Sequence, residues 1–208
     1  MKLKIHIALM GDSLTVGFIP SSLTSQPYSD FLKEYIDNFL KKLRRKNAIQ
    51  IRITNRGVNG DLTGNMLLRF KQDVVDLKPD YVIVLGGAND IGWGFPVENI
   101  FSNLRGMFET AMANGICPTG CTLPSVVGRD EGIPPRLALN KLLMDLCNAK
   151  NNPCVDLFAA TCDRDTKRLR YEYSSDGLHL NTSGYRKIAE TIFEESVKDL
   201  ILKSMDSD

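Results

Sequence analysis

Ser13 is the residue in this 208-residue chain whose type and position first suggest catalysis. It lies in the stretch GDSLTVG, residues 11–17, directly after the apolar run IHIALM. A serine hydroxyl is a weak nucleophile unless a base lies beside it. A serine between a strand and a helix is also a common helix N-cap. Ser13 is therefore either a nucleophile or a capping residue, and other parts of the chain must distinguish these roles.

Histidine is the usual base for such a serine, and the sequence contains two histidines, His6 and His179. His6 precedes Ser13 by seven residues in the same predicted strand, which separates them by about 20 Å at roughly 3.3 Å per residue. His179 is the remaining candidate. Asp176, three residues earlier in a turn-like segment, can fix the imidazole tautomer and stabilise its cation. The alternative is that Asp176 caps a turn and His179 starts a helix.

The elements that must position these residues alternate along the chain. Short apolar runs predict five strands, and amphipathic patterns with one apolar stripe predict five helices. The strands are predicted at residues 4–10, 49–55, 81–87, 116–124 and 153–158, and the helices at 30–43, 66–77, 97–114, around 139–146 and 183–202. This order predicts an α/β fold with a five-stranded parallel sheet and helices on both faces. Residues 1–208 contain no linker or repeat and are predicted to form one domain, with a tail at 204–208 that is expected to fray.

Polar residues gather in four segments that follow predicted strands. These segments are residues 11–14, 55–61, 87–90 and 176–179. In open α/β sheets, ligands bind beyond the carboxyl ends of the strands, near the point where the strand order reverses. We therefore expect these segments to meet at one rim of the sheet, although they are far apart in the sequence.

The four segments resemble the motif blocks of the GDSL hydrolases, also called SGNH hydrolases. GDSL occupies residues 11–14, the glycine of N-x-G-x-x-G-D is Gly60, G-x-N-D occupies 87–90, and D-x-x-H occupies 176–179. The blocks occur in the family's order over nearly the whole chain. The resemblance implies a flavodoxin-like three-layer sandwich and hydrolysis of esters; acyl, lysophospholipid, thioester and acetyl-sugar substrates occur in this family.

The resemblance also implies a role for each matched residue. Ser13 is the implied nucleophile, His179 its base and Asp176 the residue that orients the base. The backbone N–H groups of Ser13 and Gly60, with the Asn89 side chain, are the implied oxyanion hole. Such a hole needs donors aimed at developing negative charge, and a glycine allows close backbone approach. As local structure alone, Gly60 and Asn89 are also ordinary turn residues.

Further residues at the strand ends are expected to support the site or to line it. Asp12 and Asp90 are expected to hold their loops in shape through hydrogen bonds to nearby backbone, without a chemical role. Trp93 and Phe95 follow shortly after Asn89. These aromatic side chains either contact an acyl chain or pack under the next helix.

A polar, proline-rich loop at residues 126–136 is placed to close over the site. Its Arg129 and Arg136 are expected to be solvent-exposed; the alternative is contact with a charged leaving group. No long apolar lid is evident, which favours short acyl or acetyl esters as small-molecule substrates. The alternatives to a short-chain esterase are a carbohydrate or metabolite O-deacetylase with the same catalytic residues, and a non-catalytic flavodoxin-like binding module.

Composition narrows the class of partner and the compartment. The 26 basic and 25 acidic residues leave a net charge of +1, which gives no reason to expect nucleic acid or an anionic membrane as a partner. The basic run at residues 41–46 is expected to be a solvated helix end. No stretch approaches the roughly 20 apolar residues of a membrane span, and no signal peptide is evident. We therefore expect a cytoplasmic protein.

The cysteine pattern argues against a disulfide framework and against a metal site. The five cysteines are Cys117, Cys121, Cys147, Cys154 and Cys162, and no C-x-x-C pair occurs. Free thiols are the default in a reducing compartment. Cys117 and Cys121 have a loose metal-like spacing, but no second pair of ligands follows them. We expect neither a metal nor a cofactor.

Overall fold

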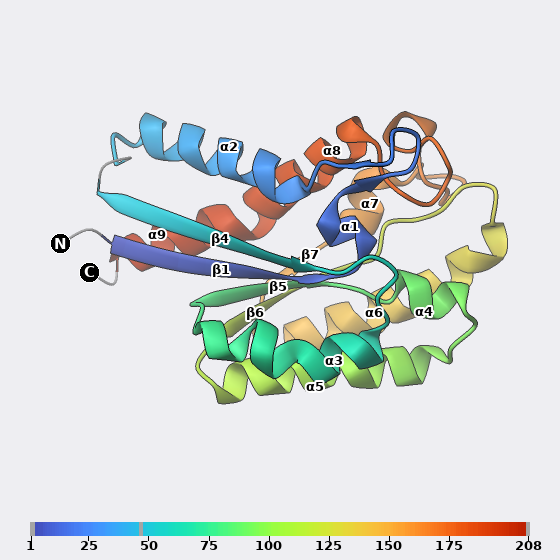
Figure 1. Cartoon of the computed structure of the whole chain (residues 1–208), viewed down its shortest axis with the longest axis horizontal. Helices are drawn as coiled ribbons and strands as arrows, with labels where there is room; N and C mark the ends of the chain where they lie inside the picture. Colours follow the sequence, from blue (N-terminus) through green and yellow to red (C-terminus); the bar gives the residue numbers. More distant parts are fainter. Residues whose placement is uncertain (1–2, 46–47, 207–208) are drawn as a thin grey trace.

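The fold is a parallel sheet between two layers of helices (Figure 1). The computed structural model describes residues 3–45 and 48–206. The sheet contains β1 (Leu3–Gly11), β4 (Ile49–Gly57), β5 (Tyr81–Leu85), β6 (Cys117–Cys121) and β7 (Cys154–Val155). All pairs are parallel, in the order β4-β1-β5-β6-β7. The predicted α/β fold, with one five-stranded parallel sheet, is confirmed.

The strand order reverses at β1. The chain passes from β1 to β4 on one side and then returns to β5 on the other side. Gly11 is level with Gly57 of β4 and with Leu85 of β5. The segments that follow these three strands therefore leave the sheet at the same edge, which is where open α/β sheets bind ligands.

Long helices cover both faces of the sheet (Figure 1). One layer contains α2 (Tyr28–Lys42), α8 (Thr182–Ile192) and α9 (Lys198–Asp206), with a π-helical segment at Phe193–Val197; the other contains α3 (Thr63–Asp73), α5 (Val97–Ala113) and α6 (Ile133–Lys150). In α2, Phe31, Leu32, Ile36 and Leu40 are buried. Their spacing places them on one helical face, which explains why this segment forms a covering helix.

Short elements lie between these long ones. They are α1 (Ser13–Val16), β2 (Phe18–Ile19), β3 (Thr24–Ser25), α4 (Ala88–Gly92), α7 (Leu157–Thr161) and 3₁₀ turns at Val75–Leu77, Asp130–Gly132 and Tyr171–Tyr173. β2 and β3 form a small antiparallel pair. Elements of this length are too short to show a hydrophobic period, so the sequence pattern does not predict them. Several of them form the rim beside the carboxyl ends of the strands (Figure 1).

Several predicted boundaries differ from the structure. The helix predicted at 183–202 is divided into α8 and α9 by the π-helical segment. The loop predicted at 126–136 ends earlier, because α6 begins at Ile133 and its prolines suit the first turn of a helix. The strand predicted at 153–158 ends at Val155, because the Asp156 side chain accepts a hydrogen bond from the Ala159 N–H at 3.0 Å and starts α7. The tail predicted to fray from residue 204 is helical through Asp206. Met205 packs against the core, which holds this last turn in place. Residues 207–208 lie outside the described part of the chain.

Three expectations from composition can be compared with the structure. Lys41 and Lys42 occupy the last turn of α2, where cations suit the helix dipole, whereas Lys46 lies outside the described residues. Over residues 3–45 and 48–206, no helix is both long enough and apolar enough to cross a membrane. All five cysteines are free thiols.

Candidate active site

Ser13 is the first residue of α1 and lies just beyond the end of β1. The N-cap of this helix is Asp12, whose carboxylate accepts a hydrogen bond from the Leu14 N–H at 2.9 Å. The capping role that was open to Ser13 is therefore filled by its neighbour. Ser13 is 7% exposed, and its hydroxyl makes no hydrogen bond within the described part of the chain. Gly17 ends the helix with φ at 80°, which a glycine adopts without strain.

Asp12 supports this turn from a fully buried position. Burial is the main cause that raises the pKa of its carboxyl group to about 7, and the negative charges of Asp90 and Asp61 add to the effect. The hydrogen bond from Leu14 opposes the shift. The second oxygen, Oδ2, has no hydrogen-bond partner among the described residues. The observed contact of Asp12 with this turn is therefore the hydrogen bond from the Leu14 N–H.

The side chains of Asp176 and His179 form a hydrogen bond with each other. His179 Nδ1 lies 2.8 Å from Asp176 Oδ2. The other carboxylate oxygen accepts hydrogen bonds from the backbone N–H groups of Leu178 at 3.0 Å and His179 at 2.8 Å. Burial alone raises the pKa of Asp176, but the hydrogen bonds from the His179 ring and from these two N–H groups outweigh it and hold the pKa below its usual value. The carboxylate therefore fixes the imidazole from one side.

His179 lies beside the segment that follows α1. Its ring meets the Phe18 ring edge to face, with 5.4 Å between centroids and 84° between planes. The Phe18 carbonyl accepts a hydrogen bond from the Tyr185 hydroxyl at 2.8 Å, which ties α8 to this segment. No hydrogen bond joins the Ser13 and His179 side chains in the residues that the structure describes. Such contacts in enzymes often tighten only in the complex with substrate.

Gly60 and Asn89 lie beyond the ends of β4 and β5, and Asn89 contacts the residue that follows Gly60. Asn89 lies in α4, and its Nδ2 donates a hydrogen bond to the Asp61 carbonyl at 2.9 Å. An amide NH₂ group carries two donors, so one N–H is engaged and the other is available. Gly60 has φ at 73°, a conformation that favours glycine. A Cβ there would meet no atom within 4 Å, so backbone conformation explains the glycine.

Asp90 connects α4 to the start of α3. It is 4% exposed, and Oδ1 accepts a hydrogen bond from the Thr63 hydroxyl at 2.6 Å. Asp90 also accepts the Thr63 N–H, while Asn103 Nδ2 donates to the Thr63 hydroxyl at 3.1 Å. The Asp90 carboxylate therefore accepts hydrogen bonds from the first residue of α3 and links α3 to α4.

Arg69 is a supporting residue that the sequence pattern does not reveal. Its guanidinium donates to the Gly11 carbonyl at 3.1 Å, to the Arg56 carbonyl at 2.9 Å and to the Asp61 and Asp73 carboxylates. It thereby joins the ends of β1 and β4 to the loop that holds Gly60. These partners are distant in the sequence, so an arginine on an amphipathic helix gives no local signal of this role.

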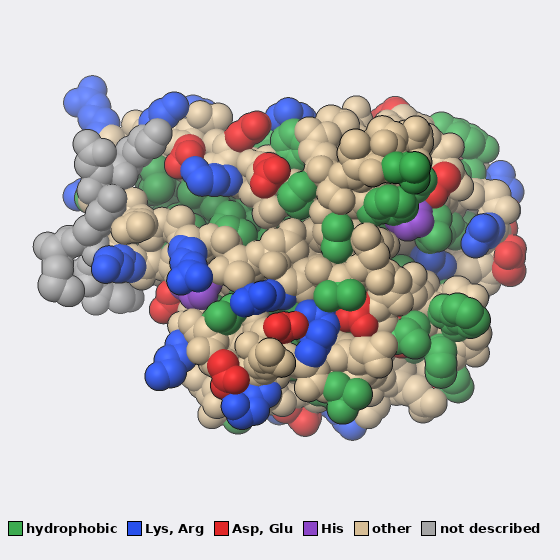
Figure 2. Space-filling model, viewed as in Figure 1, with side chains coloured by type: hydrophobic (Ala, Val, Ile, Leu, Met, Phe, Trp, Pro, Cys, Tyr) green, Lys and Arg blue, Asp and Glu red, His purple; other side chains and the backbone are tan. Residues whose placement is uncertain are grey.

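A cavity of about 340 Å³ lies beside Asn89. Its wall includes Asn89, Trp93, Arg129, Glu131, Arg136 and Leu178. The segment at 126–132, which precedes α6, is attached to the turn that carries His179, because the Val127 N–H donates to the Gly177 carbonyl at 2.9 Å. Exposed hydrophobic side chains gather at this end of the molecule, toward the right of the view in Figure 2.

The structure gives the exposure of four side chains for which the sequence left alternatives open. Trp93 is 77% exposed, so it does not pack under the next helix, and it lines the cavity. Phe95 is 47% exposed and is not among the residues that line it. The expectation that Arg136 is exposed is wrong, because this side chain is buried, whereas Arg129 is exposed.

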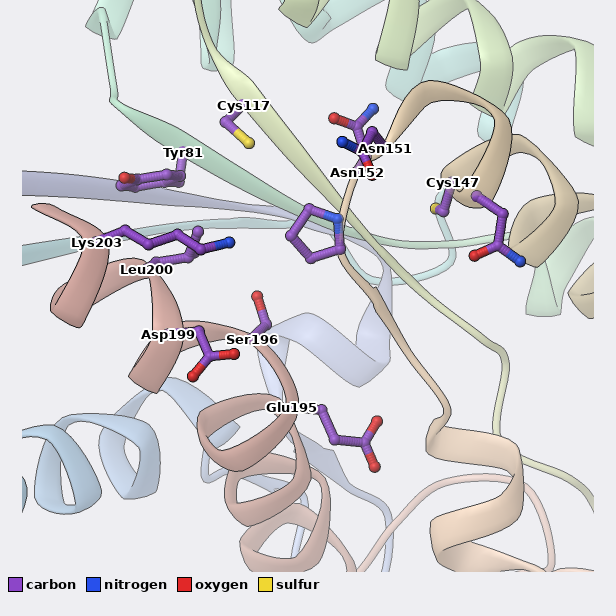
Figure 3. Close-up of a pocket in the computed structure, with 12 residues that line it drawn as sticks. Tyr81, Cys117, Cys147, Asn151, Asn152, Glu195, Ser196, Asp199, Leu200 and Lys203 are labelled. Atoms are coloured by element: carbon purple, nitrogen blue, oxygen red, sulfur yellow. The ribbon is translucent and has the colours of Figure 1, made fainter.

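Other candidate positions lie away from this rim. His6 lies within β1, level with Arg52 of β4, and its Nε2 is 2.9 Å from Thr54 Oγ1. A larger cavity of about 560 Å³ lies at the opposite edge of the sheet (Figure 3). Tyr81 and Cys117, the first residues of β5 and β6, line it. It includes none of the motif-matched residues, which makes the rim the better candidate for catalysis.

Comparison with known sequences identifies relatives of the whole domain. The model of the GDSL-like Lipase/Acylhydrolase family matches residues 9–187. An arylesterase from Vibrio mimicus is 26% identical over 197 residues, covering 93% of this chain and 89% of that protein. An uncharacterized lipoprotein, YqeF, from Bacillus subtilis (strain 168) is 35% identical over 133 residues, covering 60% of this chain and 51% of that protein.

Solved structures share the same fold. The lipase/acylhydrolase from Enterococcus faecalis superposes with a TM-score of 0.76 at 26% identity, covering 92% of this chain and 94% of that chain. A catalytic mutant of Axe2, an acetylxylan esterase from Geobacillus stearothermophilus, gives a TM-score of 0.78 at 17% identity, covering 94% and 96%. The second likeness concerns the fold alone. Since the family model covers most of the chain and all four motif segments, this protein belongs to the GDSL-like lipase/acylhydrolase family and is a carboxylic ester hydrolase.

Proposed function

We propose that Ser13 attacks a carboxylic ester and forms an acyl-enzyme, with His179 as the base and Asp176 as the residue that orients it. The 2.8 Å contact between His179 Nδ1 and Asp176 Oδ2 carries this proposal. A carboxylate at Nδ1 leaves Nε2 as the ring nitrogen that accepts a proton. The Ser13 hydroxyl supports the proposal as well, because capping by Asp12 leaves it free to act as nucleophile.

The proposed reaction has two similar halves. Ser13 Oγ transfers its proton to His179 Nε2 and bonds to the ester carbonyl carbon, which makes the carbonyl oxygen negative. This intermediate expels the alcohol, which takes the proton back from His179. Water then attacks the acyl-enzyme in the same way, with His179 again as base, and releases the acid and Ser13.

Three donors are proposed to stabilise the negative oxygen. The backbone N–H groups of Ser13 and Gly60 donate to no acceptor within the described residues. Asn89 uses one side-chain N–H for the Asp61 carbonyl, which fixes the amide and leaves its second N–H for the substrate oxygen. Donors held in advance are effective because they need no reorganisation as charge develops.

The proposed substrate is an ester with a short acyl group. The cavity beside Asn89, at about 340 Å³, is near the lower end of the range of roughly 300–1,000 Å³ for ligand pockets. The polar and charged side chains in its wall, such as Asn89 and Glu131, also support a second candidate, an O-deacetylase acting on a carbohydrate or another acetylated metabolite. The acetylxylan esterase from Geobacillus stearothermophilus has the same fold. Faster turnover of acetylated sugars than of simple acyl esters would favour this second candidate.

Hydrolysis of p-nitrophenyl esters of increasing acyl length tests the proposal, with wild type and Ser13→Ala in parallel. We expect wild type to turn over the short esters and Ser13→Ala to lose at least roughly 10³-fold in kcat. A fluorophosphonate probe should label wild type and not the variant. Turnover by Ser13→Ala within a factor of about ten of wild type would remove Ser13 as the nucleophile.

The cytoplasm is the proposed compartment. The five free cysteines support it, because thiols persist where the surroundings are reducing. One relative is a lipoprotein, so an exported or anchored form is the alternative. Fractionation of the producing cell, followed by detection of the full-length protein, distinguishes the two locations.

A further inference from the structure

Arg136 is a buried cation without a carboxylate partner. It is 4% exposed, and it forms no salt bridge with the residues that the structure describes. Its Nη1 donates to the Gly132 carbonyl at 2.9 Å, while Nε is buried and has no partner among the described residues. An unpaired charge in a protein interior is costly. This cost calls for an explanation beyond packing.

The chain makes room for this guanidinium. A Cβ at position 132 would lie 2.8 Å from Arg136 Nη1. The backbone at Gly132 has φ at −80° and ψ at −9°, which any residue adopts. A side chain at this position would therefore have to displace the end of the guanidinium, although the backbone conformation would allow it. Arg136 lines the same cavity as Asn89, the side chain of the proposed oxyanion hole.

The charges around the cavity leave it positive. Burial is the main cause that lowers the pKa of Arg136 to about 10; the charge of Asp12 opposes this shift and that of Arg129 adds to it. Arg136 is therefore a cation at neutral pH. Arg129 also lines the cavity, with Glu131 as an exposed carboxylate on the same wall. The charged residues that line the cavity are thus two arginines and one glutamate.

We propose that Arg136, assisted by Arg129, binds a negatively charged group of the substrate, so that this enzyme prefers anionic esters. The inference rests on the proposed function, since it places the reacting ester at Asn89 and the charged group further into the same cavity. A guanidinium presents a planar fork of donors that matches carboxylate and phosphate oxygens. The ligand would place a negative charge in direct contact with Arg136, whereas Asp12 influences this guanidinium without forming an ion pair with it.

The test compares matched pairs of charged and neutral esters, since the charge can lie on either side of the ester bond. For the acyl side, the pair is mono-p-nitrophenyl glutarate and p-nitrophenyl pentanoate. For the alcohol side, the pair is 4-acetoxybenzoate and 4-acetoxybenzamide. The measured quantity is the ratio of kcat/KM for the anionic ester to kcat/KM for its neutral partner.

We expect wild type to show a ratio of roughly 10 to 100 for one of the two pairs, as for hydrogen bonds to a charged group. Arg136→Gln should lower this ratio toward one, Arg136→Lys should keep part of it, and Arg129→Gln should lower it less. The control is Arg105→Gln on α5, because this arginine is half exposed, pairs with Glu109 and does not line the cavity. A purely structural role of Arg136 would change both esters of a pair equally and leave the ratio unchanged.

Failure of this inference can be distinguished from failure of the proposed function. A wild-type ratio near one for both pairs, with Ser13-dependent turnover of the neutral esters, overturns the inference alone. If no ester is hydrolysed and the fluorophosphonate does not label, the proposed function fails, and calorimetry with glutarate and 4-hydroxybenzoate tests the anion site directly. Binding by wild type and Ser13→Ala that is lost in Arg136→Gln supports the inference, and absence of binding by wild type overturns it. The wild-type measurements can overturn the inference even if Arg136→Gln does not fold.

Discussion

At the residue scale, the site depends on which side chain caps α1. Asp12 accepts the Leu14 N–H, so the Ser13 hydroxyl is not consumed by the helix it begins. The arrangement has a cost, because Asp12 is fully buried and one of its oxygens has no partner among the described residues. Burial raises the pKa of this carboxyl group to about 7, which links the stability of the fold to pH.

Substitution of Asp12 by asparagine should remove this pH dependence. Because the folded-state pKa is raised above the unfolded value of about 3.9, the contribution of Asp12 to stability is fully present below that value. It is lost as the pH rises toward about 7, at no more than about 1.4 kcal/mol per pH unit. Asparagine also caps helices. Urea unfolding should therefore show that the free energy of unfolding of Asp12→Asn rises relative to that of wild type between pH 5 and pH 7. A difference between the two proteins that does not change with pH would contradict this assignment.

The proposed oxyanion donor makes a second prediction at this scale. Asn89→Ala should lower kcat by roughly 10²–10³ with short esters, as for loss of one oxyanion donor, while the protein stays folded. Asn114→Ala, at the exposed end of α5, is the matched control and should leave kcat unchanged. Thermal unfolding of both variants checks the fold. A loss below about threefold for Asn89→Ala would remove this residue from the proposed oxyanion hole.

At the scale of elements, the turn at 176–179 is held by the segment at 126–132. Gly177 has φ at 82°, and a Cβ there would lie 2.3 Å from the Val127 carbonyl oxygen. The Gly177 carbonyl accepts the Val127 N–H in return. The two segments thus approach more closely than any side chain at 177 would allow. This contact positions His179 relative to the wall of the cavity.

Gly177→Ala should therefore disturb both stability and catalysis. Gly128→Ala is the matched control, because Gly128 also has a positive φ of 79° but a Cβ there meets nothing within 4 Å. The free energy of unfolding of the control should fall only by the cost of the left-handed conformation, about 1–2 kcal/mol. Gly177→Ala should lose clearly more in urea unfolding and should lower kcat, since the turn must move. Equal losses for the two variants would show that the close contact is unimportant.

At the scale of the whole molecule, the strand order brings the site together. Ser13 follows β1, Gly60 follows β4 and Asn89 follows β5, and these are the three adjacent strands at the reversal of strand order. The positions proposed to bind the substrate are therefore set by the sheet, whereas short elements and loops supply the side chains. This arrangement explains how residues from distant parts of the chain meet at one rim.

The cysteines supply a prediction at this scale. They are distributed over β6, α6, β7 and the end of α7, and all five are free. Burial raises the pKa of Cys121 well above its usual value, with Cys147 adding to the effect, so its thiolate is scarce in the folded protein. We expect five reactive thiols per chain in denaturant without reductant, and slow reaction in the folded state. A lower count in denaturant would indicate a disulfide.

The sequence by itself determined the fold class and indicated the four segments of the candidate site. Hydrophobic periodicity is a local property, so the long helices and the sheet strands could be predicted without knowledge of contacts. The strand ends followed from the topology that this alternation implies. The end of β7 was predicted wrongly, because the apolar run favours a longer strand whereas the Asp156 side chain caps α7 and ends the strand.

Only the tertiary structure decided which charged residues are buried and what they contact. Arg69 holds the ends of two strands, and Arg136 lies buried beside Asn89, although both occupy helices on which an arginine is normally solvated. Their burial depends on carbonyl groups, glycines and loops from other parts of the chain. The free energy of a charge depends on the dielectric surroundings and partners that packing creates. Sequence spacing carries the pattern of helices and strands, but it does not carry those surroundings.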